Sequence, residues 1–86
     1  MKYLVEITDT AYKELKRLDK PTRRKFDKAI TYLTDEPFRT KTEKLVNHPA
    51  ASFRHRIGDY RILFNLLPEN IIQIVHIWHR GKDYKK

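Results

Sequence analysis

One stretch decides the fold: Phe53-Arg54-His55-Arg56-Ile57-Gly58-Asp59-Tyr60-Arg61-Ile62-Leu63-Phe64. Two runs rich in β-forming residues flank Gly58-Asp59, and a Gly-Asp pair in that position predicts a two-residue β-hairpin turn. Side chains alternate between the two faces of a strand, so Arg54 and Arg56 share a face. Cations gathered on one face repel one another, and a chain keeps that arrangement most easily where an anion binds.

The lengths of two connections set the predicted register of the sheet. The hairpin turn has two residues, and Leu67-Pro68-Glu69-Asn70 is predicted to form a four-residue loop between strands at 60–66 and 71–79. The predicted pairs are Ile57 with Tyr60, Arg56 with Arg61 and Arg54 with Leu63 across the turn, and Leu66 with Ile71 and Arg61 with His76 across the loop.

These pairs divide the sheet into two faces of different chemistry. The predicted core face is mostly apolar: Phe53, His55, Ile57, Tyr60, Ile62, Phe64, Leu66, Ile71, Gln73, Val75 and Ile77. The predicted cationic face holds Arg54, Arg56, Arg61, Leu63, Asn65, Ile72, Ile74, His76 and Trp78, with Arg80 added by continued alternation. A slip of one residue would turn the apolar set toward water, which favours this register.

Arg56 directly opposite Arg61 departs from the usual pairing of a sheet. Like charges in that position are unfavourable by up to about 1 kcal/mol. Such departures tend to mark functional sites. The alternative is that the arginines extend outward and coat a solvated sheet, which explains one or two cations better than four arginines with a His and a Trp.

The rest of the chain predicts two helices and a connector. Residues 3–7 alternate as a strand, and Thr8 or Asp9 can cap a helix over about 9–18. Asp19 and Pro21 predict the start of a second helix, which ends at Asp35-Glu36-Pro37. In the connector, residues 44–46 fit a short strand or one helical turn. The expected fold is α+β in a single domain of residues 1–86, in the order β-α-α-(β)-β-β-β, with the helices packed on one face of an antiparallel meander.

Composition restricts the class of partner. The 86 residues carry 19 Lys and Arg against 11 Asp and Glu, a net charge of +8, which favours nucleic acid, an anionic membrane or an acidic protein. The chain has no Cys, so it has no disulfide or thiolate metal site, and its four His lack metal-ligand spacing. We therefore expect no metal and no cofactor. The first residues are too short for a signal peptide and no apolar run could span a membrane, so a cytoplasmic location is expected.

The sequence resembles the RelE/ParE superfamily of bacterial and archaeal toxins, on the RelE side. The resemblance covers nearly the whole chain and is sharpest in the basic strand before Gly58-Asp59-Tyr60-Arg61 and in Trp78-His79-Arg80 followed by Tyr84. It implies an endoribonuclease that cuts mRNA in the ribosomal A site without a metal. It also implies a cognate antitoxin as partner, in a toxin–antitoxin hetero-oligomer. The implied site residues are Arg54, Arg56, Arg61, Arg80 and Tyr84.

RNA cleavage without a metal uses the ribose 2′-OH as nucleophile and needs a base, an acid and cations around the phosphorane. Arg56 and Arg61 suit a phosphate clamp, because a guanidinium donates two parallel hydrogen bonds. Trp78 or Tyr84 could stack on an unpaired base.

The basic strand carries Arg where other family members put Lys, and Arg stays protonated, so it is a poor base. A histidine is the substitute that the sequence offers. His76 is predicted on the cationic face, whereas His79 alternates onto the other side unless the strand bends. Alternatively, catalysis is mostly electrostatic and the ribosome orders the substrate. His55 is expected in the core, and His48 is expected to be an ordinary polar side chain of the connector.

Two other functions fit the same pattern. A toxin of this fold that inhibits gyrase is favoured by the missing Lys residues and disfavoured by the His79-Arg80 ending and Tyr84. An inactive relic that binds only RNA or the antitoxin would also keep a basic surface.

Overall fold

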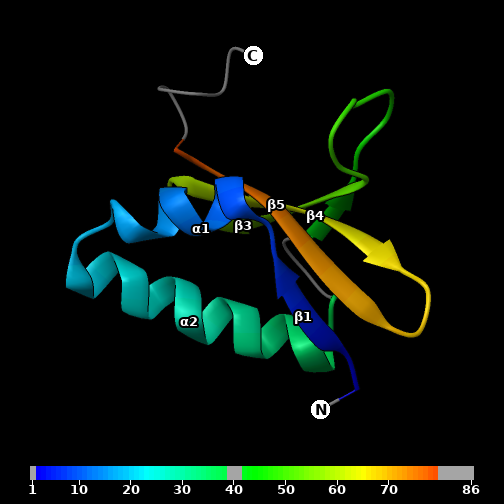
Figure 1. Cartoon of the computed structure of the whole chain (residues 1–86), viewed down its shortest axis with the longest axis horizontal. Helices are drawn as coiled ribbons and strands as arrows, with labels where there is room; N and C mark the ends of the chain where they lie inside the picture. Colours follow the sequence, from blue (N-terminus) through cyan, green and yellow to red (C-terminus); the bar gives the residue numbers. More distant parts are fainter. Residues whose placement is uncertain (1, 39–41, 80–86) are drawn as a thin grey trace.

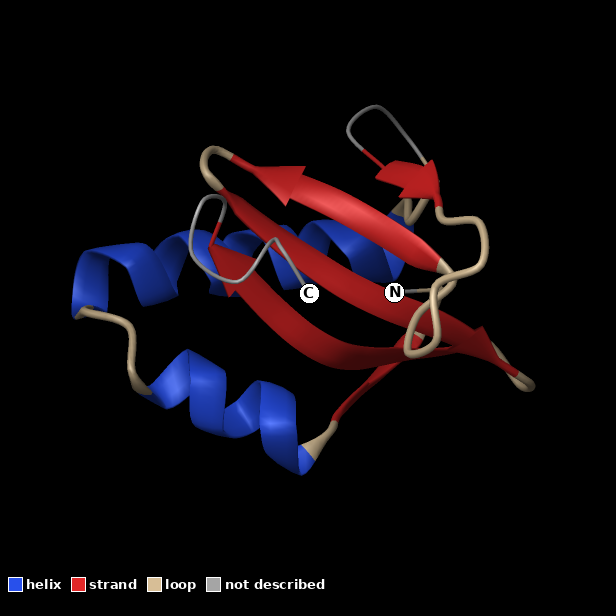
Figure 2. Ribbon diagram, turned by 90° about the horizontal axis from the view of Figure 1, so that it is seen from above, coloured by secondary structure: helices blue, strands red, loops and turns tan. Residues whose placement is uncertain are grey.

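The computed structural model describes residues 2–38 and 42–79. Its elements are β1 (Leu4–Ile7), α1 (Asp9–Lys16), α2 (Lys20–Asp35), β2 (Thr42–Lys44), β3 (Phe53–Ile57), β4 (Tyr60–Leu67) and β5 (Ile71–His79). Both helices lie on one side of a single twisted sheet (Figures 1 and 2). The predicted α+β class and element order are confirmed. Arg80 and Tyr84 lie outside the described residues.

The sheet has five strands in the order β1-β5-β4-β3-β2. The last three strands form the predicted antiparallel meander, and β2 adds to it as an antiparallel edge strand. β1 pairs with β5 in parallel, so the sheet is mixed. The connector, for which the sequence predicts a short strand or one helical turn at residues 44–46, forms a strand that begins two residues earlier, at Thr42.

Both helices begin at side-chain caps. Thr8 Oγ1 accepts a hydrogen bond from the Ala11 amide at 3.2 Å, and Asp19 Oδ1 accepts one from the Thr22 amide at 3.3 Å. Each bond satisfies an amide that has no partner within its own helix. Hydrogen bonds from Thr22, chiefly from its side chain and also from its amide, hold the pKa of Asp19 below its usual value. None of the helices in the described ranges is long and apolar enough to cross a membrane.

The hydrophobic core lies between the helices and one sheet face. Phe26 of α2 is fully buried and its ring meets that of Tyr60 edge to face at 5.2 Å. Burying apolar side chains is the main favourable term in folding. The core cluster consists of Ala11, Leu15, Phe26, Leu33, Ile62, Phe64, Ile72, Ile74 and Ile77.

The predicted register between β4 and β5 is wrong in two places. The loop between these strands has three residues, 68–70, so Ile71 pairs with Leu67 and not with Leu66. A β-bulge then inserts Val75 as an extra residue, because Phe64 pairs with Ile74 while Leu63 pairs with His76. Such a bulge re-aims the side chains that follow it.

The bulge changes which residues of β5 face the core. Ile72 and Ile74, predicted on the cationic face, are fully buried in the core. Ile71 and Gln73, predicted in the core, take the opposite face together with Leu67 and Asn65. The shorter loop and the extra residue each shift the pairing by one residue, and the total shift of two restores the predicted alternation of faces beyond the bulge. Ile77 therefore faces the core as predicted, and Arg61 pairs with Trp78 rather than with His76.

Candidate nucleic-acid interface

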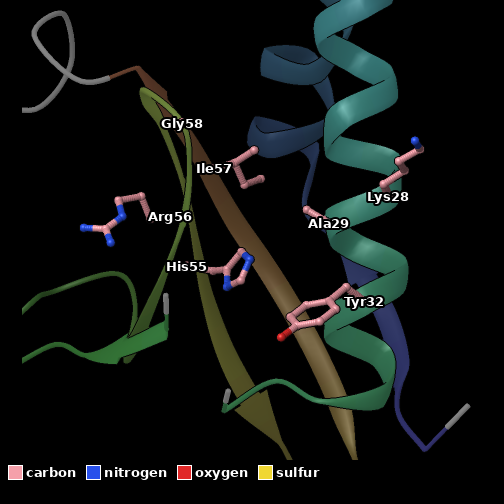
Figure 3. A pocket seen from close by; sticks show the side chains of 7 residues that line it. All are labelled: Lys28, Ala29, Tyr32, His55, Arg56, Ile57 and Gly58. Atoms are coloured by element: carbon pink, nitrogen blue, oxygen red, sulfur yellow. The ribbon is translucent and has the colours of Figure 1, made fainter. Parts of the chain in front are cut away.

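The sheet face turned away from the helices, here called the outer face, carries the cations. Arg54 pairs with Leu63 and Arg56 with Arg61, as predicted from the two-residue turn. Figure 3 shows the alternation directly: His55 and Ile57 point toward α2, and Arg56 points away from it. Three arginines from two adjacent strands therefore share one side of the sheet.

These arginines line a small cavity together with one carboxylate. The cavity has a volume of about 120 Å³ and is lined by Glu43, Arg54, Arg56 and Arg61; we call it the arginine cavity. Glu43 lies on β2 directly opposite Arg54. Sequence reasoning missed Glu43, because the strand that carries it is only three residues long. The signal present in the sequence was an acidic residue between two β-compatible positions.

Glu43 is the counter-ion of the arginine cavity. It forms an ion pair with Arg54. The pKa of Glu43 lies below its usual value, first because Arg54 donates a hydrogen bond to the carboxylate and adds its charge, and then because of the charges of Arg56 and Arg61. Glu43 is therefore ionised at neutral pH and neutralises part of the positive field. An anion that enters the cavity competes with it for Arg54.

Arg61 is held by the hairpin turn. Its Nη1 donates to the carbonyl oxygens of Tyr60, at 3.0 Å, and of Gly58, at 3.3 Å. Gly58 has φ +55°, a left-handed conformation that glycine adopts without steric cost. The Gly-Asp-Tyr-Arg sequence thus builds a turn whose carbonyl groups fix the guanidinium beside the cavity.

Three aromatic rings lie beside the arginines on the outer face. The Trp78 ring centroid is 5.6 Å from that of His76 and 5.6 Å from that of His48. Nδ1 of His48 accepts hydrogen bonds from the amides of Ala50 and Ala51, at 3.1 and 3.2 Å. His48 is therefore more than an ordinary polar side chain: it belongs to the outer face and is fixed there by its own loop.

That loop, residues 45–52, folds over the outer face (Figure 2). Its ends are joined by a bond from the Leu45 amide to the Ser52 carbonyl at 2.8 Å. Asn65 on β4 anchors it, since its Oδ1 accepts from the Ser52 amide and its Nδ2 donates to the Ala50 carbonyl. Leu63, which lies between Arg54 and His76 on the outer face, is only 1% exposed although it lies outside the main core. We call residues 45–52 the covering loop.

The structure separates the predicted site residues into two groups. Arg54, Arg56, Arg61, His76 and Trp78 share the outer face. His79 pairs with Tyr60 and its ring meets the Tyr60 ring at 4.7 Å, on the helix side. His55 is 4% exposed, as expected for a core histidine, and bonds Thr42 Oγ1 through Nδ1 at 2.8 Å.

A cavity of about 360 Å³ between α2 and β3 is larger than the arginine cavity. It lies mainly on the helix side and is bordered by apolar groups of Ala29, Tyr32 and Ile57 (Figure 3). Two cations, Lys28 and Arg56, also line it, against three in the arginine cavity, so we place anion binding at the arginine cavity. Within residues 2–38 and 42–79, no group of three His, Asp or Glu side chains could hold a metal ion.

Two helices on one face of a mixed five-stranded sheet are the fold that this chain shares with toxins of the RelE/ParE class. The chain belongs to the family described as the ParE toxin of the type II toxin–antitoxin system parDE, whose model matches residues 5–84.

Solved structures agree with this assignment. The chain is similar to a protein in the archaeal RelE–RelB complex from Pyrococcus horikoshii, with 31% identity over 95% of this chain and 99% of that one, at a TM-score of 0.79. It is also similar to a chain of a RelBE toxin–antitoxin complex from Mycobacterium tuberculosis, with 29% identity, 93% and 100% coverage and a TM-score of 0.80. A YoeB/ParE toxin from Agrobacterium tumefaciens shares the fold at 15% identity, 90% and 98% coverage and a TM-score of 0.77. No curated protein matches the sequence.

Proposed function

We propose that this toxin is a metal-independent endoribonuclease that cleaves mRNA on the ribosome and so inhibits translation. The observation that carries the proposal is the arginine cavity, which Arg54, Arg56 and Arg61 line on the outer face of the sheet. Three guanidinium groups supply donors for the equatorial oxygens of a phosphorane. The aromatic rings next to the cavity offer a surface for an unpaired base.

The chemistry assigns a role to each group. Arg56 and Arg61 bind the oxygens of the scissile phosphate and stabilise the extra negative charge of the transition state. His76 on β5 lies diagonally from Arg61 on β4, because Arg61 pairs with Trp78, two residues beyond His76. It is the candidate base for the 2′-OH. From the family resemblance, Arg80 would stabilise the leaving oxygen and Tyr84 would stack on a base.

The proposed partner is an antitoxin. The relatives from Pyrococcus horikoshii and Mycobacterium tuberculosis were both solved in complexes with an antitoxin. A net charge of +8 suits a partner that covers the outer face with acidic residues. The free toxin would then act in the cytoplasm, where ribosomes and mRNA are found, and the neutralised form would be a hetero-oligomer.

Inhibition of gyrase is the second candidate function. The matching family model is that of the ParE toxin, and the basic strand carries Arg54 and Arg56 in place of a Lys that could act as a base. Both candidates predict toxicity relieved by an antitoxin, so toxicity alone does not separate them.

The two functions are separated by paired assays on one preparation. Purified toxin is added to translating ribosomes, and cleavage of the mRNA is mapped by primer extension. The same toxin is added to gyrase in a supercoiling assay. We expect discrete mRNA cleavage and unchanged supercoiling. Intact mRNA together with inhibited supercoiling would contradict the nuclease proposal and favour the second candidate.

Replacing Glu43 by Gln is expected to strengthen RNA binding by about two- to fivefold, the size of effect typical of an exposed ion pair. The substitution removes the negative charge that pairs with Arg54, while the side chain at position 43 keeps its shape. Binding is measured by fluorescence anisotropy with a labelled RNA whose 2′-O-methyl groups prevent cleavage. Glu69→Gln, in the exposed loop between β4 and β5, makes the same change in net charge away from the cavity. Equal affinities of the two variants would show that Glu43 does not compete with RNA.

A further inference from the structure

The carboxylate of Glu14 on α1 contacts the edge of β5 beyond the end of β1. Glu14 Oε1 accepts a hydrogen bond from the Ile77 amide at 2.7 Å, and Glu14 Oε2 lies 3.4 Å from Nδ1 of His76. The Ile77 amide is open to this contact because β1 pairs only with Ile71–Ile74, and no other strand of the described residues covers that edge of β5. One side chain therefore covers the strand edge and holds an imidazole at the same time.

The contact with Glu14 indicates which tautomer a neutral His76 adopts. An ionised carboxylate accepts hydrogen bonds and donates none, so the proton between Glu14 and His76 belongs to Nδ1. A neutral imidazole carries one proton. Nε2 of His76 is then left as an acceptor with a free lone pair, the form that a general base requires.

The position of His76 fits the same role. His76 lies on the outer face and pairs with Leu63 of β4, the strand that carries Arg61. The centroid of its ring lies 5.6 Å from that of Trp78. The side chains of His76 and Glu14 are 28% and 24% exposed, so the pair is partly shielded from water while the site stays open. The imidazole of His76 thus contacts a carboxylate of α1 and the ring of Trp78.

We propose that Glu14 is a positioning residue that holds His76 in the Nδ1–H form, with Nε2 ready to take the proton of the ribose 2′-OH. This inference rests on the proposed nuclease function. In the step, the 2′-oxygen forms a bond to phosphorus as its proton passes to Nε2, and the bond from phosphorus to the 5′-oxygen breaks. The leaving 5′-oxygen takes a proton from water, and the product is a 2′,3′-cyclic phosphate. Glu14 stabilises the imidazolium formed on His76.

Glu14→Gln tests the proposal with little change of shape. The Ile77 amide needs an acceptor, so the Gln carbonyl oxygen takes that contact and the Gln NH₂ group faces Nδ1 of His76. An NH₂ group donates, and it therefore favours the Nε2–H form of the ring. Cleavage of mRNA is expected to fall on the order of 10²-fold, the low end of general-base contributions, while the melting temperature stays near that of the wild type.

The tautomer of His76 is determined by long-range ¹H–¹⁵N NMR of the imidazole nitrogens, at a pH high enough for the ring to be neutral. The chain has four histidines, so the signals are assigned with His→Gln variants. We expect the Nδ1–H form of His76 in the wild type and the Nε2–H form in Glu14→Gln. Glu6→Gln is the matched control, because Glu6 accepts a bond from Gln73 Nε2 at 3.1 Å on the same sheet without touching a histidine. It should keep the wild-type spectrum and rate.

Two results would overturn the proposal: an Nε2–H form of His76 in the wild type, or a Glu14→Gln variant that switches form yet cleaves at the wild-type rate. A wild type that does not cleave mRNA overturns the proposed function instead. The spectra require no activity, so in that case they still decide whether Glu14 sets the form of His76.

Discussion

Replacing Arg61 by Ala is expected to slow mRNA cleavage by about two to three orders of magnitude, the loss typical of removing one fixed donor to a transition-state oxyanion. Arg61 should matter more than its neighbours for two reasons. Its guanidinium is already fixed by the carbonyl groups of Gly58 and Tyr60, so little reorganisation is needed when charge develops. Arg54, in contrast, is partly neutralised by Glu43. Single-turnover cleavage on ribosomes gives the rate.

Arg24→Ala is the matched control for this prediction. Arg24 lies exposed on α2, away from the outer face, and its loss changes the net charge by the same amount. Its cleavage rate should remain within about twofold of the wild type, since surface substitutions rarely disturb a fold. Arg61→Lys keeps the charge but lacks the two-pronged donor, so it should fall between the wild type and Arg61→Ala. If Arg61→Ala and Arg24→Ala cleaved equally well, the arginine cavity would not be the catalytic site.

Phe64→Ala is expected to destabilise the domain by about 3–5 kcal/mol, as for other buried aromatic residues. Phe64 is fully buried, its ring stacks on that of Phe53 at 5.4 Å, and it pairs with Ile74 directly before the bulge. Small domains have a total stability of only about 5–15 kcal/mol. The variant should therefore be largely unfolded at modest urea concentrations, as measured by circular dichroism.

Leu4→Ala provides the comparison for the core substitution. Leu4 is 68% exposed on β1, so its truncation removes little buried surface. Its unfolding midpoint in urea should lie close to that of the wild type. A Phe64→Ala variant as stable as Leu4→Ala would contradict the placement of Phe64 in the core.

The local features of the fold follow from the sequence. The Gly58-Asp59 turn fixes the pairing of Arg56 with Arg61, since a two-residue hairpin allows one register. Asp19 caps α2, because its carboxylate satisfies an amide that the helix cannot. These features depend on a few adjacent residues, and the shared face of the three arginines follows from them.

The features that the sequence did not predict depend on contacts between distant segments. The alternation of residues in a strand does not indicate where an extra residue such as Val75 is inserted. The position of the bulge depends on which apolar side chains pack against the helices. Glu43 reaches the arginines only after β2 pairs with β3, and Glu14 reaches His76 across 62 positions of the chain. The fold brings Glu43 to the outer face and Glu14 to the edge of β5, and neither position follows from the residues next to it in the sequence.

The most direct test of the central claim is to map RNA binding on the toxin by NMR. A short RNA with 2′-O-methyl groups, which cannot be cleaved, is titrated into ¹⁵N-labelled protein. We predict that the largest shifts fall on the outer face, at Arg54, Arg56 and Arg61 and at the indole N–H of the single tryptophan, Trp78. Shifts confined to the exposed basic side of α2, at Arg23, Arg24, Lys25 and Lys28, with the outer face unchanged, would contradict RNA binding at the arginine cavity.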